Sequence, residues 1–243
     1  MHPAAGVIRE LWRYPVKSMS GERCDALRLE ARGVQGDRQF AVTTSDGKAG
    51  SGKNTRRFRK VDGLLDFTAS HAGPSLRIRF PSGEVLDRDD ADVHLSLSEA
   101  LGQPVTLRRE GAVCHLDAAP VHLITSASLR WLESALPDAG ISARRFRPNL
   151  VIDWPGDRPV EATWAGMRIS IGNQVKLTVS AATERCGMVA LGQGDLPRDA
   201  RVLRHIVQHA ESHFGAYAQV IVPGVVRLDD PVVIERVGEE PAV

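Results

Sequence analysis

The sequence is poor in cysteine and in aromatic residues. Its 243 residues include three cysteines, Cys24, Cys114 and Cys186, and aromatic side chains make up 5% of the chain. An odd number of cysteines at wide spacings excludes a disulfide framework and a zinc ribbon, and it is typical of a reducing compartment. Neither Cys24 nor Cys114 has a neighbour that points to thiolate chemistry, so both are expected to pack as small apolar side chains.

Long apolar runs and a large net charge are also missing. No stretch approaches the roughly 18 consecutive apolar residues of a membrane-spanning helix. The first residues, Met-His-Pro-Ala-Ala-Gly, lack the basic and apolar regions of a signal peptide. Lysine plus arginine number 31 against 30 aspartate plus glutamate, a net charge of +1, which indicates neither nucleic acid nor a membrane as partner. A soluble cytoplasmic protein is predicted.

Short apolar segments separated by glycine and proline dominate the chain. Leu76, Ile78 and Phe80 alternate with polar residues, which is typical of a half-buried strand. Strands and helices do not alternate regularly, so barrel-like sheets are favoured over a doubly wound parallel sheet. The expected fold is mainly β with few helices, of the α+β class. Further strands are predicted at residues 7–16, 39–43, 105–107, 150–152, 167–171, 175–180 and 219–222.

Two helices and one domain boundary are predicted. Residues 126–135 have leucines at helical spacing, with Thr125 or Ser126 available to cap the first turn. Residues 198–213 carry one apolar stripe, and Gly215 follows it as an expected stop signal. The polar segment at 87–92 could join two units, so we expect one domain at 1–95 and a second at 96–243.

Two patterns resemble ligand sites but favour simpler interpretations. Residues 47–54 nearly form a phosphate-binding loop, but that motif needs Ser or Thr after the lysine, and Asn54 follows Lys53 here. A flexible basic loop over a binding cleft is therefore expected. His205, His209 and His213 recur every four residues, but the third lies too far along a helix to join the same metal ion. They are predicted to lie on a solvated helix face.

An arginine-rich segment, Arg-Arg-Phe-Arg-Pro-Asn at 144–149, precedes the expected strand at 150–152. Arginine suits bidentate binding of phosphate, and the amide of Asn149 offers a donor and an acceptor to the edge of a heterocycle. On its own, the segment fits either an anion site or a solvated edge. Weaker signals of the same kind occur at strand ends, at residues 14–18, 36–38 and 117–120.

Cys186 is the strongest candidate for a residue with a chemical role. It follows Arg185 at the exit of the expected strand at 175–180, and a neighbouring cation favours the thiolate form. A thiolate there could ligate a metal, carry sulfur, attack a substrate or have no chemical role. The residues alone leave these four alternatives open.

Five short segments, in order along the chain, resemble the MOSC family, which is named for the C-terminal domain of molybdenum cofactor sulfurases. Within it, the chain is most similar to the amidoxime-reducing components of mitochondria and their bacterial relatives, over nearly its whole length. The matching segments are Tyr-Pro-Val-Lys-Ser at 14–18 and Gly-Asp-Arg at 36–38 for the N-terminal domain, Phe-Arg-Pro-Asn at 146–149 and Arg-Cys at 185–186 for the core, and Phe-Gly-Ala-Tyr at 214–217 for the end.

The resemblance implies an N-terminal β-barrel-like domain packed on a MOSC β-barrel domain, and a molybdenum–molybdopterin cofactor. Cys186 corresponds to the cysteine whose sulfur binds molybdenum, so it is also the implied catalytic residue. Molybdenum accepts soft sulfur ligands, which agrees with this correspondence. The other implied cofactor contacts are Lys17, Ser18, Arg38, Asp117, Ala118, Ala119, Arg147, Asn149, Glu184, Arg185 and Tyr217.

The implied activity is reduction of N-hydroxylated compounds, such as amidoximes or N-hydroxylated bases, to amines, independently of pyridoxal phosphate. Electrons would come from a separate protein: a ferredoxin, a cytochrome b5-like protein or a flavin reductase. Two alternatives stay open, a sulfur carrier with a persulfide on Cys186 and a non-catalytic protein that binds or delivers molybdopterin. Ala190 stands where many relatives have one of a threonine pair, which leaves the substrate class open.

Overall fold

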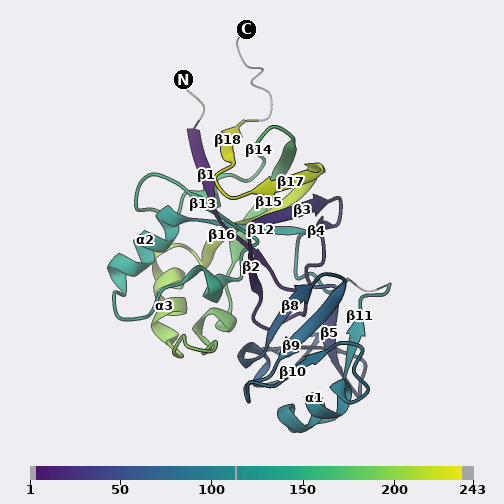
Figure 1. The fold of residues 1–243 in the computed structure, drawn as a ribbon. Helices are drawn as coiled ribbons and strands as arrows, with labels where there is room; N and C mark the ends of the chain where they lie inside the picture. Colours follow the sequence, from purple (N-terminus) through teal and green to yellow (C-terminus); the bar gives the residue numbers. More distant parts are fainter. Residues whose placement is uncertain (1–3, 113, 237–243) are drawn as a thin grey trace.

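The computed structural model describes residues 4–112 and 114–236, and it shows two lobes (Figure 1). The predicted fold class, mainly β with few helices, is confirmed: the described residues form three α-helices and many short strands. The upper lobe in Figure 1 contains β1, β12–β16, β18, α2 and α3, and the lower lobe contains β5, β8–β11 and α1. No helix in the described part of the chain is long and apolar enough to cross a membrane.

The upper lobe is a closed barrel of seven strands. Its order is β13-β12-β16-β15-β14-β18-β1, and a β13–β1 pairing closes the ring. Neighbouring strands are antiparallel except β12 and β13, which are parallel. The strands are β1 (Ala4–Arg13), β12 (Val121–Thr125), β13 (Leu150–Asp153), β14 (Arg168–Ile171), β15 (Val175–Glu184), β16 (His213–Val222) and β18 (Pro231–Glu235), with β2 (Glu22–Cys24) added on β1.

Strands β12 and β13 are buried on both faces, which explains why apolar residues follow one another directly in Leu123–Ile124 and Leu150–Ile152. Leu123 and Leu150 point into the barrel core. Ile124 and Val151, one residue further along, belong to a second core that includes residues of α2 and α3. A strand covered on both sides needs no polar alternation. The helices that cover the barrel are α2 (Ser126–Ala135) and α3 (Ala200–His209).

The lower lobe has its own core between short sheets. Leu76 and Ile78 of β9 are buried while Arg77 and Arg79 are exposed, so the predicted alternation is confirmed. The sheets of this lobe have the orders β11-β5-β6-β7 and β10-β9-β8. A further sheet, β17-β3-β4, lies in the upper lobe, where its buried residues Leu27, Leu29, Val34 and Val226 join the barrel core (Figure 1). These elements are β3 (Ala26–Glu30), β4 (Gly33–Val34), β5 (Phe40–Thr44), β6 (Ala49–Ser51), β7 (Phe58–Lys60), β8 (Thr68–Ala72), β9 (Ser75–Arg79), β10 (Val85–Asp87), α1 (Val93–Leu101), β11 (Val105–Arg109) and β17 (Gly224–Arg227).

Of the two predicted helices, one is confirmed and the other is shorter than expected. Helix α2 begins at Ser126, and the Thr125 hydroxyl caps it by accepting the N–H of Ser128 at 3.1 Å. Helix α3 ends at His209 because Glu211 and Ser212 adopt left-handed backbone angles, φ 49° and 67°. The prediction of a helix to residue 213 is therefore wrong. The short 3₁₀ helices are η1 (Leu64–Asp66), η2 (Ala143–Phe146), η3 (Glu161–Thr163) and η4 (Gly187–Ala190).

The early end of α3 also separates the three histidines. His205 and His209 stack with ring centres 4.4 Å apart, and His205 packs on Trp131 at 4.7 Å. His213 begins β16 instead, and Gly215 lies inside that strand rather than after a helix. The prediction of one solvated helix face for all three histidines is wrong, since His205 is half-buried and His213 lies on another element.

The boundary near residue 95 stays a prediction. Strand β1, from the first predicted domain, completes the barrel of the upper lobe. Strand β11, from the second, pairs with β5 of the lower lobe. The chain therefore passes between the lobes more than once, and the segments that make these passages meet in the region between the lobes.

Candidate functional site

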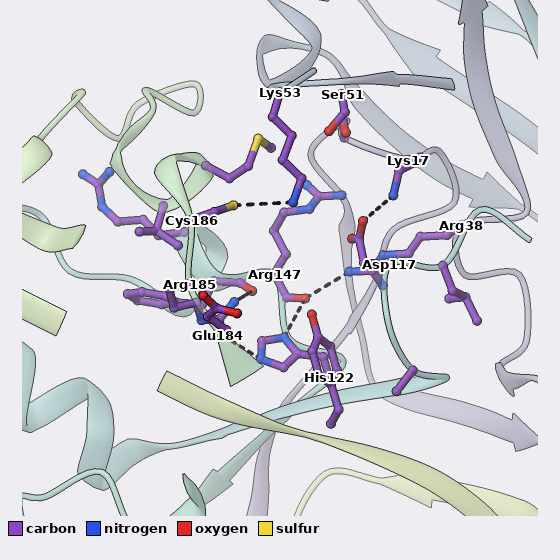
Figure 2. Close-up of a pocket in the computed structure, with 18 of the residues that line it drawn as sticks. Lys17, Arg38, Ser51, Lys53, Asp117, His122, Arg147, Glu184, Arg185 and Cys186 are labelled. Atoms are coloured by element: carbon purple, nitrogen blue, oxygen red, sulfur yellow. Dashed lines mark hydrogen bonds and ion pairs between the residues drawn. The ribbon is translucent and has the colours of Figure 1, made fainter. Parts of the chain in front are cut away.

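A pocket lies where these segments meet, and it encloses about 860 Å³ of space, part of it open to solvent. Figure 2 shows Cys186 and Lys53 facing each other on one side of the pocket, with Lys17, Asp117 and Arg38 on the other. The lining residues are Lys17, Ser18, Arg38, Ser51, Lys53, Leu116, Asp117, Ala119, His122, Arg145, Phe146, Arg147, Asn149, Glu184, Arg185, Cys186, Met188, Val189 and Tyr217.

The pocket brings together every site residue predicted from the sequence except Ala118, which does not line it. The contacts of these residues with a cofactor stay predictions. Lys53 and Ser51 come from the glycine-rich loop, which therefore borders a cleft as expected. Arg145 and Phe146 come from the arginine-rich segment at 144–149, whereas His122, Met188, Leu116 and Val189 were not predicted.

Lys17 is a buried cation on the right-hand side of the pocket in Figure 2. Its ammonium donates to Asp117 Oδ1 at 2.6 Å and to the His115 carbonyl at 3.0 Å, and it lies 4.2 Å from the centre of the Phe58 ring. Burial lowers the pKa of Lys17, although Asp117 opposes that effect. Burial would raise the pKa of Asp117, but the charges of Lys17 and Arg38 outweigh it and hold that pKa below its usual value. This ion pair fixes the turn at 116–119 against the end of β1.

Arg38 and Arg147 share the ring of Tyr14, with their guanidinium carbons 4.9 and 4.3 Å from its centre. Arg38 forms an ion pair with the buried Asp37 and donates to the Arg147 carbonyl at 3.2 Å. Arg147 donates to the Met19 carbonyl at 2.6 Å, and its Nη2 is buried with no partner among the described residues. Burial, followed by the charge of Arg38, lowers the pKa of Arg147 to about 10. Arg147 is thus a cation that the protein compensates only in part.

Three pocket residues have left-handed backbone conformations without being glycine. The φ angles are 64° for Ser18, 49° for Arg38 and 55° for Arg147. Each such residue costs of order 1–3 kcal/mol, and this kind of strain clusters at functional sites. The observation supports a binding role for this pocket.

His122 links Arg147 to Arg185. Arg185 donates to the carbonyls of Phe214 at 2.6 Å and Phe146 at 3.2 Å, and its Nη2 lies 2.7 Å from His122 Nε2. His122 Nδ1 lies 3.2 Å from the Arg147 carbonyl, which can only accept, so Nδ1 carries the proton and Nε2 accepts from Arg185. Burial, helped by Arg185, lowers the pKa of His122 well below 6.5, so the ring is neutral. Burial also lowers the pKa of Arg185 to about 10.

The remaining predicted motif residues have structural bonds. Asn149 accepts the N–H of His122 at 3.1 Å and donates to the Trp12 carbonyl at 3.3 Å, so its amide joins β12 to β1. Arg145 is buried and donates to four backbone carbonyls, and Arg144 pairs with Asp195 at the surface. Of the three arginines in the segment, Arg147 is the one left with a free buried donor.

Cys186 stands at the end of β15, where it precedes η4 and is half-buried. Its sulfur lies 3.9 Å from the Lys53 ammonium. The other cysteines do not line the pocket: Cys24 packs against the barrel core as expected, whereas Cys114 is exposed, contrary to the prediction. The pocket therefore contains a single thiol.

The pocket combines positive charge with that thiol. Six cationic residues line it (Lys17, Arg38, Lys53, Arg145, Arg147 and Arg185) against two carboxylates (Asp117 and Glu184), a formal balance of +4. Within residues 4–112 and 114–236, no group of three or more His, Cys, Asp or Glu side chains is arranged to hold a metal ion. A metal at Cys186 would need its other ligands from a bound group. A ligand that has an anionic group and carries a metal that accepts sulfur ligands would match both the positive charge of the pocket and its thiol.

Comparison with known proteins identifies two family models that together span most of the chain. The MOSC domain matches residues 90–233, and the MOSC N-terminal beta barrel domain matches residues 5–116. Mitochondrial amidoxime-reducing component 1 of Mus musculus is 24% identical over 93% of this chain and 82% of its own length. The protein of the same name from Danio rerio is 28% identical over 74% of this chain and 67% of its own.

A third relative matches half of the chain, and solved structures share the fold. Molybdenum cofactor sulfurase 2 of Culex quinquefasciatus is 32% identical over 46% of this chain and 16% of its own length. The crystal structure of the YUAD protein of Bacillus subtilis has a TM-score of 0.55 at 13% identity and covers 95% of both chains. At that identity the likeness concerns the fold alone.

Proposed function

The chain belongs to the MOSC domain family, and on that premise we propose that it is a molybdenum-cofactor-dependent oxidoreductase that reduces N-hydroxylated compounds to amines. The observation that carries the proposal is the single thiol, Cys186, in a pocket with six cationic residues. A molybdenum cofactor has a phosphate at one end and a metal that accepts sulfur ligands at the other, and the pocket offers a partner for each. The names of two relatives, both amidoxime-reducing components, support the reaction class.

The residues divide into two groups around such a cofactor. Lys17, Arg38 and Arg147 would hold its anionic part, because Lys17 and Arg38 are buried cations and the half-buried Arg147 has a buried Nη2 that no described residue uses. Cys186 would ligate the metal, and Arg185, fixed by the Phe214 carbonyl at 2.6 Å, would hold the chain beside it. When bound, the cofactor supplies a molybdenum centre that exchanges electrons with the substrate. The protein binds it, orients it and excludes water from its anionic end.

The reaction has a simple balance. An N-hydroxylated substrate takes up two electrons and two protons, its N–O bond breaks, and the products are the amine and water. Among the described residues no cluster of side chains is arranged to hold a metal. We propose that a separate electron-transfer protein supplies the electrons. A ferredoxin, a cytochrome b5-like protein and a flavin reductase are the proposed donor classes. The open side of the pocket, beside Cys186 and Lys53, is where the substrate would enter.

Substitution Cys186→Ser tests the proposal. Wild-type protein from a molybdenum-replete host should convert benzamidoxime to benzamidine with reduced methyl viologen as artificial donor, and the variant should not. The circular dichroism spectrum and the thermal unfolding temperature should be unchanged. Cys186 is half-buried, and among the described residues the one polar contact of its sulfur is with the Lys53 ammonium at 3.9 Å. Full activity in a folded Cys186→Ser protein would overturn the ligand role.

A sulfur carrier is the second candidate, and the match to a molybdenum cofactor sulfurase favours it. Cys186 would then hold a persulfide, and no metal would be needed. Intact-mass measurement of the purified protein separates the two: one added sulfur on Cys186 without pterin favours the carrier. Bound cofactor without turnover would instead indicate a protein that stores or delivers molybdopterin.

A further inference from the structure

Lys53 differs from the other cations of the pocket. Lys17 and Arg38 have carboxylate partners, and Arg145, Arg147 and Arg185 donate to backbone carbonyls. Lys53 is exposed, and among the described residues its ammonium has one polar contact, the Cys186 sulfur at 3.9 Å. Sulfur is a weak acceptor. The ammonium is therefore available to a ligand at the open side of the pocket.

The loop that carries Lys53 is held against the residues that follow Cys186. A Cβ on Gly52 would lie 2.2 Å from Met188 Sδ, so the backbone of the loop touches η4 directly. The Val61 N–H donates to the Ser51 carbonyl at 2.9 Å, which closes the loop at its base. These contacts place residue 53 at the pocket mouth (Figure 2). The four-carbon stem then lets the ammonium move between the sulfur and a ligand.

Arg57 holds the other end of the same loop. Its guanidinium donates to the carbonyl of Cys114 at 2.7 Å and to that of Leu116 at 3.2 Å, beside the turn that carries Asp117. The loop thus bridges the two sides of the pocket mouth. It presents Lys53 outside the buried cations that face the deeper part of the pocket.

We infer that Lys53 binds an anionic group on the substrate, so that the pocket prefers N-hydroxylated compounds that carry a phosphate or carboxylate over neutral ones. This inference rests on the proposed function and names its substrate class. An amidoxime or N-hydroxylated base with a negative charge away from its N–O bond would satisfy both the reacting position and Lys53.

The test uses pairs of substrates that differ by one added anionic group: N-hydroxycytidine with its monophosphate, and benzamidoxime with para-carboxybenzamidoxime. The wild-type holoenzyme should show a higher kcat/KM for the charged member of each pair. In Lys53→Met the ratio of charged to neutral kcat/KM should fall roughly tenfold, the size expected for one charge-assisted contact, mainly through KM. Lys53→Arg should restore the preference. Lys48→Met, which removes the same charge from the turn before β6 and outside the pocket, should leave the ratio unchanged.

An equal change for both members of a pair in Lys53→Met, or no preference in the wild type, would overturn the inference while leaving the proposed function intact. Calorimetric binding of N-hydroxycytidine and its monophosphate to the holoenzyme, without an electron donor, adds a readout that needs no turnover. Tighter binding of the monophosphate that is lost in Lys53→Met supports the inference. Equal binding of the two in the wild type contradicts it, even if the protein reduces neither and the proposed function fails.

Discussion

Arg147 is a half-buried cation whose charge the protein satisfies only in part. Its Nη2 is buried with no partner in the described part of the chain, and its pKa is lowered to about 10 by burial and by Arg38. A buried charge without full compensation is destabilising, and an added anion relieves the cost. The partly compensated charge of Arg147 therefore indicates an anionic ligand, and this argument does not depend on the family assignment.

Substitution Arg147→Met should weaken cofactor retention by about 1–3 kcal/mol, the value of one hydrogen bond to a charged group. The free energy of unfolding of the cofactor-free protein should not decrease, because a partly compensated buried charge is removed. Pterin content after gel filtration and urea unfolding measure the two effects. Arg144→Met is the matched control, since Arg144 pairs with Asp195 at the surface. Undiminished pterin retention in Arg147→Met would contradict the assignment.

His122 predicts a pH dependence of stability. Its pKa is ordinarily about 6.5 in an unfolded chain and lies well below that in the folded protein, because of burial and the neighbouring charges of Arg185 and Arg38. The unfolded state therefore binds more protons below pH 6.5, and stability falls as the pH drops through that value. Above it, the contribution of His122 is fully present.

The variant His122→Gln isolates this effect, because an amide can donate to the Arg147 carbonyl and accept from Arg185 without titrating. Between about pH 7 and about pH 5.5, wild-type cofactor-free protein should lose stability more steeply than the variant, by up to about 1.4 kcal/mol per pH unit. The other histidines with lowered pKa values, His71, His115 and His205, affect both proteins equally. Identical slopes in urea unfolding would show that His122 titrates normally.

At the scale of elements, β16 passes so close to the pocket that one of its residues must be glycine. Gly215 has φ 92°, and a Cβ there would lie 2.6 Å from His122 Nε2 and 2.9 Å from Arg185 Nη2. The strand therefore holds the His122–Arg185 contact in place by direct approach of its backbone. A side chain at this position would separate the two groups.

Substitution Gly215→Ala should lower the free energy of unfolding by more than Gly166→Ala does. Gly166 has a similar φ, 81°, but open space around it, so its variant reports backbone strain alone, about 1–2 kcal/mol. The clash at Gly215 should add about 1–3 kcal/mol and reduce cofactor retention. Denaturant unfolding and pterin content of both variants give the comparison, and equal losses would argue against a clash at the pocket.

Local signals predicted some elements well and misjudged others. Helix α2 was predicted because its leucine spacing and its Thr125 cap lie within one short segment. Helix α3 was predicted too long because helical spacing continues through His213, whereas the left-handed Glu211 and Ser212 end it. Nothing in the residue types of that stretch indicates the change, since it depends on where β16 must begin in the barrel.

At the scale of the whole molecule, the pocket is made by segments far apart in the sequence. Arg147 donates to the Met19 carbonyl, 128 residues away, and Lys17 reaches Asp117 across 100 residues. Most pocket residues were predicted because each sits in a short motif of a known family. His122 and Lys53 were missed because their roles come from contacts with Arg185 and Cys186 that only the folded chain creates.

The molybdenum content of the purified protein tests the central claim most directly. We predict stoichiometric molybdenum, with pterin, in wild-type protein from a host whose other molybdenum enzymes are loaded. Elemental analysis by mass spectrometry, with Cys186 shown to be intact by peptide mapping, is the measurement. Protein from such a host that contains neither molybdenum nor pterin would contradict the assignment of this pocket as a molybdenum-cofactor site.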